Sequence, residues 1–508
     1  MDADTILRIK PTLTTFLHEF DDCFGRSQTR GHLATYVRGQ LSDLPRKSVE
    51  PMADAAGVPE RSLQQFLSLL RWNESMMRDR LQQHVARHHG HHHSVGIIDE
   101  TSYVKKGDKT ACVQRQHCGA AGKRENCVVS VHLGYAAPGT DPGPREPGGF
   151  HTLLDGELYL PQHTWHEDRD RCREAGIPDE VVYRTKHDIA LEQYRRAVAN
   201  GVRFRWMTFD EFYGRSGPFL REFDAAGQDY VAEVPKNFHV WTQPPQVLHR
   251  RHDRDIRPTG RPGRPRKYPR LKVKNNPSVT VQNVLLHSPL MRKQPWVKYR
   301  IKDTSKGPMV WEAKRMLVYL KDENDLPVSA SQGGAAKAYH LLIARNVLNP
   351  SEVKYFISNA SEDTPVETLL LVAFSRWKIE RMFEDSKMEL GLDHYEARKY
   401  QAISRHLLIS CVSHLFLAEF HLERRGEKSG ADDQPGGDGG VEAGDAVAAR
   451  RSLLATTGRG ASRATGVNAG PQRQSRPQPP QADSSRIARD WNHVEEPVPV
   501  SVGEDVAL

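Results

Sequence analysis

The segment Val95-Gly-Ile-Ile-Asp99 marks the point where the chain changes from a helical to a mixed α/β pattern. A short apolar run that ends at an acidic residue is typical of a buried strand. Further strands are predicted over residues 127–133, 153–160, 205–210 and 230–234, with a candidate turn at Asp155-Gly156, and a helix is predicted over 188–199. Strands that alternate with helices in this way predict a mixed α/β sheet with helices packed on it, spanning residues 94–245.

Residues 1–90 precede this sheet and have a helical pattern. Apolar residues recur three and four positions apart in two sets, Leu13, Leu17 and Phe20, and Leu63, Phe66, Leu67 and Leu70. Gly57 lies between the sets and suits a tight turn, because a residue with a Cβ resists the left-handed conformation. The pattern fits a helix-turn-helix or an ordinary pair of antiparallel helices equally well.

The segment His88-His89-Gly90-His91-His92-His93 follows the helical region. A metal site is one interpretation of such a run. We favour a polar linker, because no cysteine or carboxylate framework stands beside the histidines in the sequence. Cys112, Cys118 and Cys127 also lack the close paired spacing of a zinc site.

The composition predicts a soluble protein of two to four domains, with 38% hydrophobic and 27% charged residues in 508. No apolar run approaches the roughly 20 residues of a membrane span, and the start lacks the regions of a secretory signal. Six cysteines in this length fit a reducing cytosol rather than a disulfide scaffold. We expect a cytoplasmic protein with no membrane partner.

A basic arm interrupts the α/β pattern after residue 245. Residues 250–274 hold eleven lysines and arginines against Asp253 and Asp255, a net charge of +9, whereas the whole chain carries +8. Four prolines make it an extended arm rather than a packed element. Its centre resembles an AT-hook, although proline precedes Gly263 where that motif has arginine. DNA contacts are therefore predicted for Arg261, Arg264, Arg266 and Lys267.

The rest of the chain divides into three parts. Residues 246–360 comprise the arm and a strand-rich region, with strands predicted over 279–281, 296–301, 316–320, 339–343 and 354–357. Residues 361–425 are helical: a capping box at Thr364-Pro-Val-Glu367 begins a helix that runs toward Gly391, with room for a break, and a second helix covers 404–422. Residues 426–508 hold no Phe or Tyr and are predicted to be disordered.

Three acidic residues stand in positions where they can converge. Asp99 and Asp210 each end a predicted strand, and Glu380 lies in the predicted long helix. Three such carboxylates can hold two Mg²⁺ ions about 4 Å apart, one activating the attacking oxygen and one stabilising the leaving oxygen of a phosphodiester. Glu100, Glu211 and Glu384 are rival ligands, because each lies next to or one helical turn from a candidate.

Arg376, Glu380 and Lys387 fall on one helical face if the helix is continuous. That stripe suits a metal ligand flanked by two phosphate-binding cations. The alternative is an exposed helix face on which Arg376 and Glu380 form an ordinary ion pair. The helix considered alone favours this alternative.

Taken together, these residues resemble the DDE transposases of bacterial insertion sequences, in particular the class with a Y-R-E-K signature. Arg376, Glu380 and Lys387 match that signature at the right spacing, while Ala373 takes the tyrosine position. Further likeness lies in Ile97–Gly107, Gln116–Cys127, Leu158–Pro161, Phe209–Gly214 and Gly391–Tyr395. Each piece alone is short, but their joint order over residues 10–425 is specific.

The resemblance implies a ribonuclease-H-like core with Asp99, Asp210 and Glu380 as the catalytic metal triad, using Mg²⁺ or Mn²⁺. It implies a strand-rich insertion between Asp210 and Glu380, and contacts to DNA from Arg376 and Lys387. Lys105 and Lys106, in the matching stretch after the first aspartate, are further predicted DNA contacts. The partners that the resemblance implies are double-stranded DNA and a second copy of the chain in a synaptic dimer. The DNA would be bound as terminal inverted repeats, by residues 1–90, and as the target. The protein would act in the cytoplasm of a bacterium, associated with the nucleoid.

The predicted function is therefore a transposase that cuts at its element's ends and joins them to target DNA. A metal-dependent nuclease without strand transfer is one alternative, because the same triad serves both. A catalytically defective DNA-binding repressor of transposition is the other. The abrupt change of composition after Arg425 also suggests a C-terminal tail read out of frame, a hypothesis that the other two reading frames of the DNA would test.

Overall fold

The computed structural model describes residues 3–138, 149–249, 268–273, 276–304, 307–329 and 334–431, all within one compact unit, Met1–Arg459. The four arm residues Arg261, Arg264, Arg266 and Lys267 lie outside the described residues, as does everything beyond 431. Among the described residues, no helix is long and apolar enough to cross a membrane.

The N-terminal region is helical, as predicted, and its helices are α1 Ala3–His18, α2 Ser27–Leu41, α3 Val49–Ala56, α4 Glu60–Ser68 and α5 Glu74–His88, with a 3-10 turn at Asp21–Cys23. Gly57 ends α3 in the left-handed conformation, with φ 65°, and its N–H donates to the carbonyl of Asp54 at 3.1 Å. The turn predicted at Gly57 is thus confirmed, for the conformational reason given.

The mixed α/β sheet predicted for the centre of the chain is confirmed. Its strands are β1 Val95–Val104, β2 Gln114–Cys118, β3 Lys123–Ala136, β4 His151–Leu158, β5 Trp206–Phe209 and β6 Tyr230–Val234. β3 pairs antiparallel with β1, β2 and β4, whereas β5 runs parallel to both β1 and β6. The parallel register places Asp99, in the middle of β1, beside the carboxyl end of β5.

The candidate turn at Asp155-Gly156 is wrong, because both residues lie inside β4. Gly156 serves packing instead: a Cβ there would lie 2.4 Å from the His132 ring on the neighbouring strand. The Asp155-Gly156 pair favours a turn by its composition, but the close approach of the buried His132 side chain requires a glycine inside the strand here.

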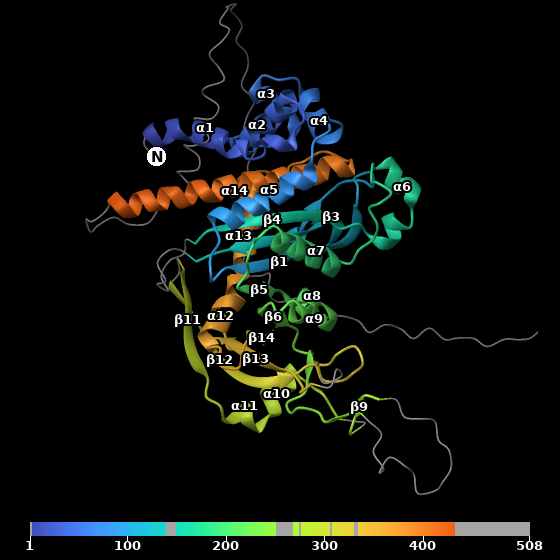
Figure 1. The fold of residues 1–508 in the computed structure, drawn as a ribbon, viewed down its shortest axis with the longest axis vertical. Helices are drawn as coiled ribbons and strands as arrows, with labels where there is room; N and C mark the ends of the chain where they lie inside the picture. Colours follow the sequence, from blue (N-terminus) through green and yellow to red (C-terminus); the bar gives the residue numbers. More distant parts are fainter. Residues whose placement is uncertain are drawn as a thin grey trace, which may run out of the picture. The chain divides into compact units, whose positions relative to one another are not determined.

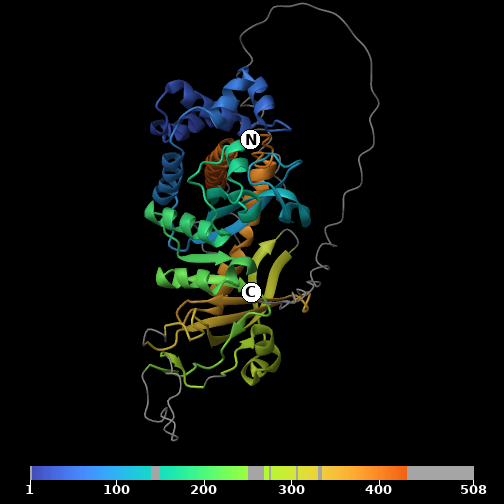
Figure 2. The ribbon, with the colours of Figure 1, turned by 90° about the vertical axis from the view of Figure 1, so that its right-hand side faces the viewer.

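The strands of the insertion extend the central sheet rather than forming a sheet of their own (Figure 2). They are β11 Val297–Thr304, β12 Gly307–Tyr319, β13 Ala338–Asn346 and β14 Val353–Ser358. β14 pairs antiparallel with β6, and the order continues outward through β13 and β12 to β11. Within the described ranges, ten strands thereby form one sheet. Two short helices that the sequence did not predict, α10 Val281–His287 and α11 Pro289–Lys293, precede β11.

The ends of the basic arm are paired. β8 Val247–Leu248 runs antiparallel to β9 Arg270–Leu271, and β7 His239–Val240 pairs with β10 Val279–Thr280. Lys272 N–H adds a hydrogen bond to the carbonyl of Gln246 at 2.8 Å. The prediction that all of 250–274 is unpacked is therefore wrong for Arg270 and Leu271, whose backbone closes the base of the arm.

The C-terminal helices are α12 Val366–Ser375, α13 Trp377–Met388 and α14 Tyr400–Ala431 (Figure 1). The prediction of a capping box at Thr364 is wrong. Pro365 takes the N-cap position without a side-chain hydrogen bond, and the Thr364 hydroxyl is hydrogen-bonded to the Ser361 hydroxyl at 3.1 Å. The helix is interrupted at Arg376, between α12 and α13. α14 extends six residues past the predicted boundary at 425, so that part of the predicted disordered segment is helical.

Helices cover both faces of the sheet. The remaining described helices are α6 Arg169–Glu174, α7 Lys186–Ala199, α8 Glu211–Gly214, α9 Gly217–Ala225, the π-helix Gln162–His166 and a 3-10 turn at Gly119–Ala121. α7 packs on β3, α13 packs on β1 and β4, and α14 packs on β4 and against α2, α4 and α5. The N-terminal helices and the sheet therefore share one hydrophobic core through α14.

Candidate active site

Asp99 and Asp210 lie next to each other on two parallel strands. The prediction that Asp99 ends its strand is wrong, because β1 continues to Val104, whereas Asp210 directly follows the last residue of β5. Ile98 in β1 pairs with Phe209 in β5, so the residue after each of them is an aspartate. Asp210 caps α8, and its carboxylate accepts hydrogen bonds from the N–H groups of Phe212 (3.0 Å) and Tyr213 (3.3 Å). The Asp99 carboxylate accepts one from the N–H of Glu100 at 2.7 Å. Both carboxylates are held by nearby backbone.

Arg376 connects the first aspartate to the glutamate of the helix. Its Nη1 donates to Asp99 Oδ2 at 2.9 Å and its Nη2 donates to Glu380 Oε1 at 2.7 Å. The ion pair with Glu380 that the alternative interpretation expected is therefore present, but the same guanidinium also reaches Asp99. The break between α12 and α13 lies at Arg376, which is the residue in contact with both carboxylates.

The site has an excess of buried negative charge. The side chain of Asp99 is 14% exposed, against 49% for Glu380. Burial and the neighbouring charge of Asp210 raise the pKa of Asp99 to about 7, although Arg376 opposes the shift. Burial likewise raises the pKa of Asp210. Two adjacent carboxyl groups that resist joint ionisation are a setting in which a bound cation relieves the repulsion.

Among the described residues, the buried Tyr213 hydroxyl has no hydrogen-bond partner. The pKa of Tyr213 is raised well above its ordinary range by burial first, and then by the charges of Glu100, Asp99 and Asp210. The adjacent carboxylates of Asp99 and Asp210 supply the oxygen ligands that hard divalent cations prefer. The residues present therefore fit a divalent metal ion.

The rival carboxylates have other surroundings. Glu100 points to the opposite face of β1 from Asp99, as alternation along a strand requires, and pairs there with Lys186 at 2.6 Å. Glu384 pairs with Arg381 at 3.3 Å. Glu211 lies at the start of α8, where burial and the charge of Glu233 raise its pKa. None of the three has a hydrogen bond or ion pair with Arg376 among those found in the described part of the chain.

The other predicted DNA-binding lysines on the core do not join Arg376. Lys387 lies at the far end of α13 with its Nζ 5.8 Å from the Tyr103 ring centroid, and burial lowers its pKa. Lys105 Nζ donates to the Tyr395 carbonyl at 2.8 Å, and burial lowers its pKa to about 8. Lys106 is exposed beside it. Ala373, at the tyrosine position of the signature, is buried in α12.

Sequence reasoning missed two lysines in this region, Lys302 and Lys378. Lys302 in β11 lies with its Nζ 3.8 Å from the Trp377 ring centroid, and burial lowers its pKa while the charge of Glu380 opposes that change. Burial lowers the pKa of Lys378 to about 8, with the charge of Lys302 adding to the shift. The position of Lys378 next to Arg376 was a usable signal. Nothing local marked Lys302, which comes from the insertion.

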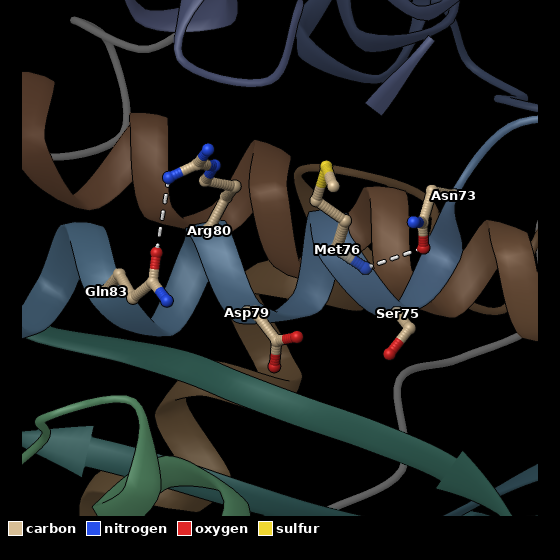
Figure 3. A pocket seen from close by; sticks show the side chains of 6 residues that line it. All are labelled: Asn73, Ser75, Met76, Asp79, Arg80 and Gln83. Carbon is tan, nitrogen blue, oxygen red and sulfur yellow. Dashed lines mark hydrogen bonds between the residues drawn. The ribbon is translucent and has the colours of Figure 1, made fainter. Parts of the chain in front are cut away.

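A shallow pocket of about 330 Å³ lies along α5, away from these carboxylates, and is lined by Asn73, Ser75, Met76, Asp79, Arg80 and Gln83 (Figure 3). Asp79 and Ser75 accept hydrogen bonds from Arg196 of α7 at 2.7–2.8 Å. The polar groups of this pocket thus hold α5 to α7, and none of its lining residues is a predicted site residue.

The family described as DDE superfamily endonuclease matches residues 19–308, more than half of the chain and a range that includes Asp99 and Asp210. The chain belongs to the DDE superfamily endonucleases. Enzymes of this superfamily use divalent metal ions, in agreement with the oxygen ligands that the two adjacent aspartates offer.

The chain is also similar to a probable transposase for insertion sequence element IS701 from Microchaete diplosiphon. The two are 29% identical over 216 residues, which is 42% of this chain and 50% of the relative. The chain thus aligns with half of that protein's length. The insertion-sequence resemblance read from the motifs agrees with this relative.

Proposed function

We propose that this DDE superfamily endonuclease is a transposase that cuts at the ends of an insertion sequence and joins them to target DNA. The observation that carries the proposal is the meeting of Asp99 within β1, Asp210 directly after β5, and Arg376 and Glu380 at the start of α13. The similarity to an insertion-sequence transposase supports the substrate, DNA.

In this proposal Asp99, Asp210 and Glu380 hold two divalent ions, Mg²⁺ in preference and Mn²⁺ as a substitute. When bound, the ions would activate the attacking oxygen and stabilise the leaving oxygen of the phosphodiester. Backbone N–H groups orient Asp210, and Arg376 orients both Asp99 and Glu380. Arg376 has a second task, since it keeps the carboxylates from repelling each other before metal arrives.

DNA is proposed to approach the exposed side of Glu380. Trp377 and Glu380 are both about half exposed, at 49% each, and Lys302 and Lys378 lie beside them. A cationic rim around an acidic metal site is suited to guide a polyanion to the reacting phosphate. The basic arm and the turn between α3 and α4 are the proposed contacts to more distant DNA, and the active species is proposed to be a dimer.

The experiment is cleavage and joining with a labelled duplex that carries a terminal inverted repeat of the element. Wild-type protein with Mg²⁺ should release the end and join it to a second duplex. Asp99→Asn, Asp210→Asn and Glu380→Gln should each lower cleavage more than about 100-fold, because even partners of metal ligands account for 10–100-fold, while end binding stays largely intact.

Glu384→Gln is the matched control, an exposed glutamate one turn further along α13. It should cleave at the wild-type rate. Full cleavage by Glu380→Gln together with loss in Glu384→Gln would transfer the role to Glu384. Cleavage without joined product would instead favour the nuclease alternative, and end binding by wild-type protein without cleavage would favour the repressor.

A further inference from the structure

A histidine–carboxylate cluster lies between α5 and α14, formed by residues that the proposed catalysis does not use. His84 Nε2 and His89 Nε2 lie 2.6 Å and 2.7 Å from the same atom, Glu419 Oε1. These three ligand atoms all lie within 4.8 Å of one another. They come from two elements separated by more than 300 positions in the chain, so only the tertiary fold brings them together.

The ligand atoms have the type and spacing of a zinc site. Two imidazole nitrogens and one carboxylate oxygen are a common set for Zn²⁺, whose bonds of about 2.0–2.2 Å hold tetrahedral ligands roughly 3.5 Å apart. An ion could take the place of the two hydrogen bonds to Glu419 with small movements of the side chains. The remaining coordination position would be left for water.

The surroundings orient the ligands as metal sites do. His84 Nδ1 lies 2.8 Å from Glu19 Oε2, and Arg87 donates to the same oxygen at 3.0 Å. A ligating histidine that donates its second N–H to a carboxylate is the usual arrangement around a bound metal, because that bond fixes the tautomer and the ring. Glu19 therefore has the position of a supporting carboxylate.

The cluster is also enclosed by aromatic rings. The His89 ring stacks on Phe150 with centroids 3.8 Å apart and planes 6° apart, and Phe16 meets the His84 ring edge-on at 5.6 Å. The side chain of His84 is 7% exposed, that of His89 12% and that of Glu419 20%. Apolar walls strengthen a metal–carboxylate bond and exclude competing water.

A second group, Glu19, His84 and His88, also meets the geometric condition for three ligands. His88 is exposed, and Glu19 is already paired with Arg87. His84 can bind an ion through only one ring nitrogen, because in the neutral ring the other nitrogen carries the hydrogen. The more buried group with Glu419 is therefore the better site. The interpretation of His88–His93 as a polar linker is incomplete, because the carboxylates that meet these histidines in the fold, Glu19 and Glu419, lie far from them in the sequence.

We propose that His84, His89 and Glu419 bind one zinc ion that fastens α5 to α14 and so holds the N-terminal helices to the catalytic sheet. The ion would serve to fasten the two helices, because its ligands come from the end of α5 and from α14 and share no residue with the Asp99 site. Its removal should loosen the N-terminal helices rather than alter the carboxylates.

The test uses the full chain, purified without a histidine tag, in a buffer with excess Mg²⁺ to fill oxygen-rich sites. Elemental analysis should find about one zinc per wild-type chain, and chelation should lower Tm, with Zn²⁺ restoring it. His89→Gln and Glu419→Gln should lose the zinc and the Zn²⁺-dependent rise in Tm. His92→Gln, an exposed histidine of the same run, should behave as wild type.

Should either variant fail to fold, Co²⁺ added to chelated wild-type protein provides an independent readout. Visible absorption of a tetrahedral nitrogen–oxygen site, lost when Zn²⁺ is added, supports the proposal. Wild-type protein without stoichiometric zinc, without a Zn²⁺ effect on Tm and without the Co²⁺ bands overturns it and leaves a hydrogen-bonded network only. Zinc lost from His92→Gln but kept by Glu419→Gln also overturns it, because the metal then belongs to the exposed histidines.

Discussion

Arg376 Nη1 lies 2.9 Å from Asp99 Oδ2, although 277 positions separate the two residues in the chain. The second nitrogen of the same guanidinium holds Glu380. One side chain at a helix break therefore links the glutamate of α13 to the aspartate in β1. The planar fork of arginine makes this possible, because lysine offers a single point charge.

Replacing Arg376 should affect stability and cleavage together. Arg376→Ala removes the cation between two carboxylates, and we expect a loss of about 2 kcal/mol in the free energy of unfolding, less than for a fully buried pair. Cleavage should fall and require more Mg²⁺. Arg376→Lys should be intermediate. Urea unfolding and Mg²⁺ titration of cleavage measure both effects.

The control is Arg381→Ala, since Arg381 is half exposed and pairs with Glu384 and Asp385 on the same helix. It should cost less than about 1 kcal/mol and leave the Mg²⁺ requirement unchanged. Equal effects of the two alanine variants would mean that the bridge to Asp99 has no special role.

Gly214→Ala should destabilise the region beside Asp210. A Cβ at Gly214 would lie 1.9 Å from the carbonyl oxygen of Glu233 in β6, a backbone atom that cannot turn away. We expect a loss of about 1–3 kcal/mol in the free energy of unfolding and reduced cleavage, because α8 carries its cap at Asp210. Thermal unfolding and the cleavage assay measure this.

Gly31→Ala is the comparison for that variant. Gly31 lies in α2 with nothing within 4 Å of a Cβ, so alanine should stabilise the helix by up to about 1 kcal/mol. The two substitutions are chemically identical and should have opposite signs. The same sign in both would contradict the steric explanation.

His406 should make the fold sensitive to acid. It is fully buried, with Tyr36 and the Leu392 carbonyl on its two nitrogens, and burial lowers its pKa to about 4. Because an unfolded histidine titrates near 6.5, the unfolded state binds more protons between pH 6.5 and 4. Stability must therefore fall as pH falls through that window, by up to about 3 kcal/mol at its lower end.

In His406→Gln, the side-chain amide can still form hydrogen bonds with Tyr36 and the Leu392 carbonyl, but it does not take up a proton. Its free energy of unfolding should depend on pH between 6.5 and 4 with a slope smaller by up to about one proton than that of wild type. Chemical unfolding across this range provides the measurement. An unchanged slope would assign the acid sensitivity to other buried histidines, such as His414, whose pKa burial lowers to about 3.

Neutralising the arm should flatten the salt dependence of DNA binding. Alanine at Arg261, Arg264, Arg266 and Lys267 removes four charges, and each lost phosphate contact lowers the slope of log K against log salt by about 0.9. Arg173 and Arg195, which are exposed on α6 and α7 and paired with acidic residues, supply the control. A slope unchanged by the arm substitutions would show that the arm does not touch phosphates.

Most elements were predictable because their signals are local. Apolar runs located five of the six core strands, all except β2, and the four long strands of the insertion, and glycine chemistry located the turn after α3. Predictions were wrong where a neighbouring residue determined the local structure. Gly156 lies inside a strand against His132 rather than in a turn, and Pro365 takes the N-cap position that was predicted for Thr364. Such outcomes depend on side chains distant in sequence.

The same division holds for the candidate site. Strand and helix context singled out Asp99, Asp210 and Glu380, and the family resemblance implied them as a triad. The sequence could not indicate that Arg376 reaches Asp99, that Lys302 approaches Trp377, or that Glu419 meets His84 of α5 and His89 of the histidine run. A sequence records which residues share one helix or strand, but not which elements meet.

By itself, the sequence determined the period of each element, because backbone geometry and burial repeat every few residues. It also determined the concentration of positive charge in the arm and the position of Asp210 after a strand, whereas it placed the end of the strand at Asp99 too early. The tertiary structure alone decided that β14 joins β6 and that the break at Arg376 faces Asp99. Pairing of strands and packing of helices across hundreds of positions depend on the whole core, and those contacts turn separate carboxylates into one site.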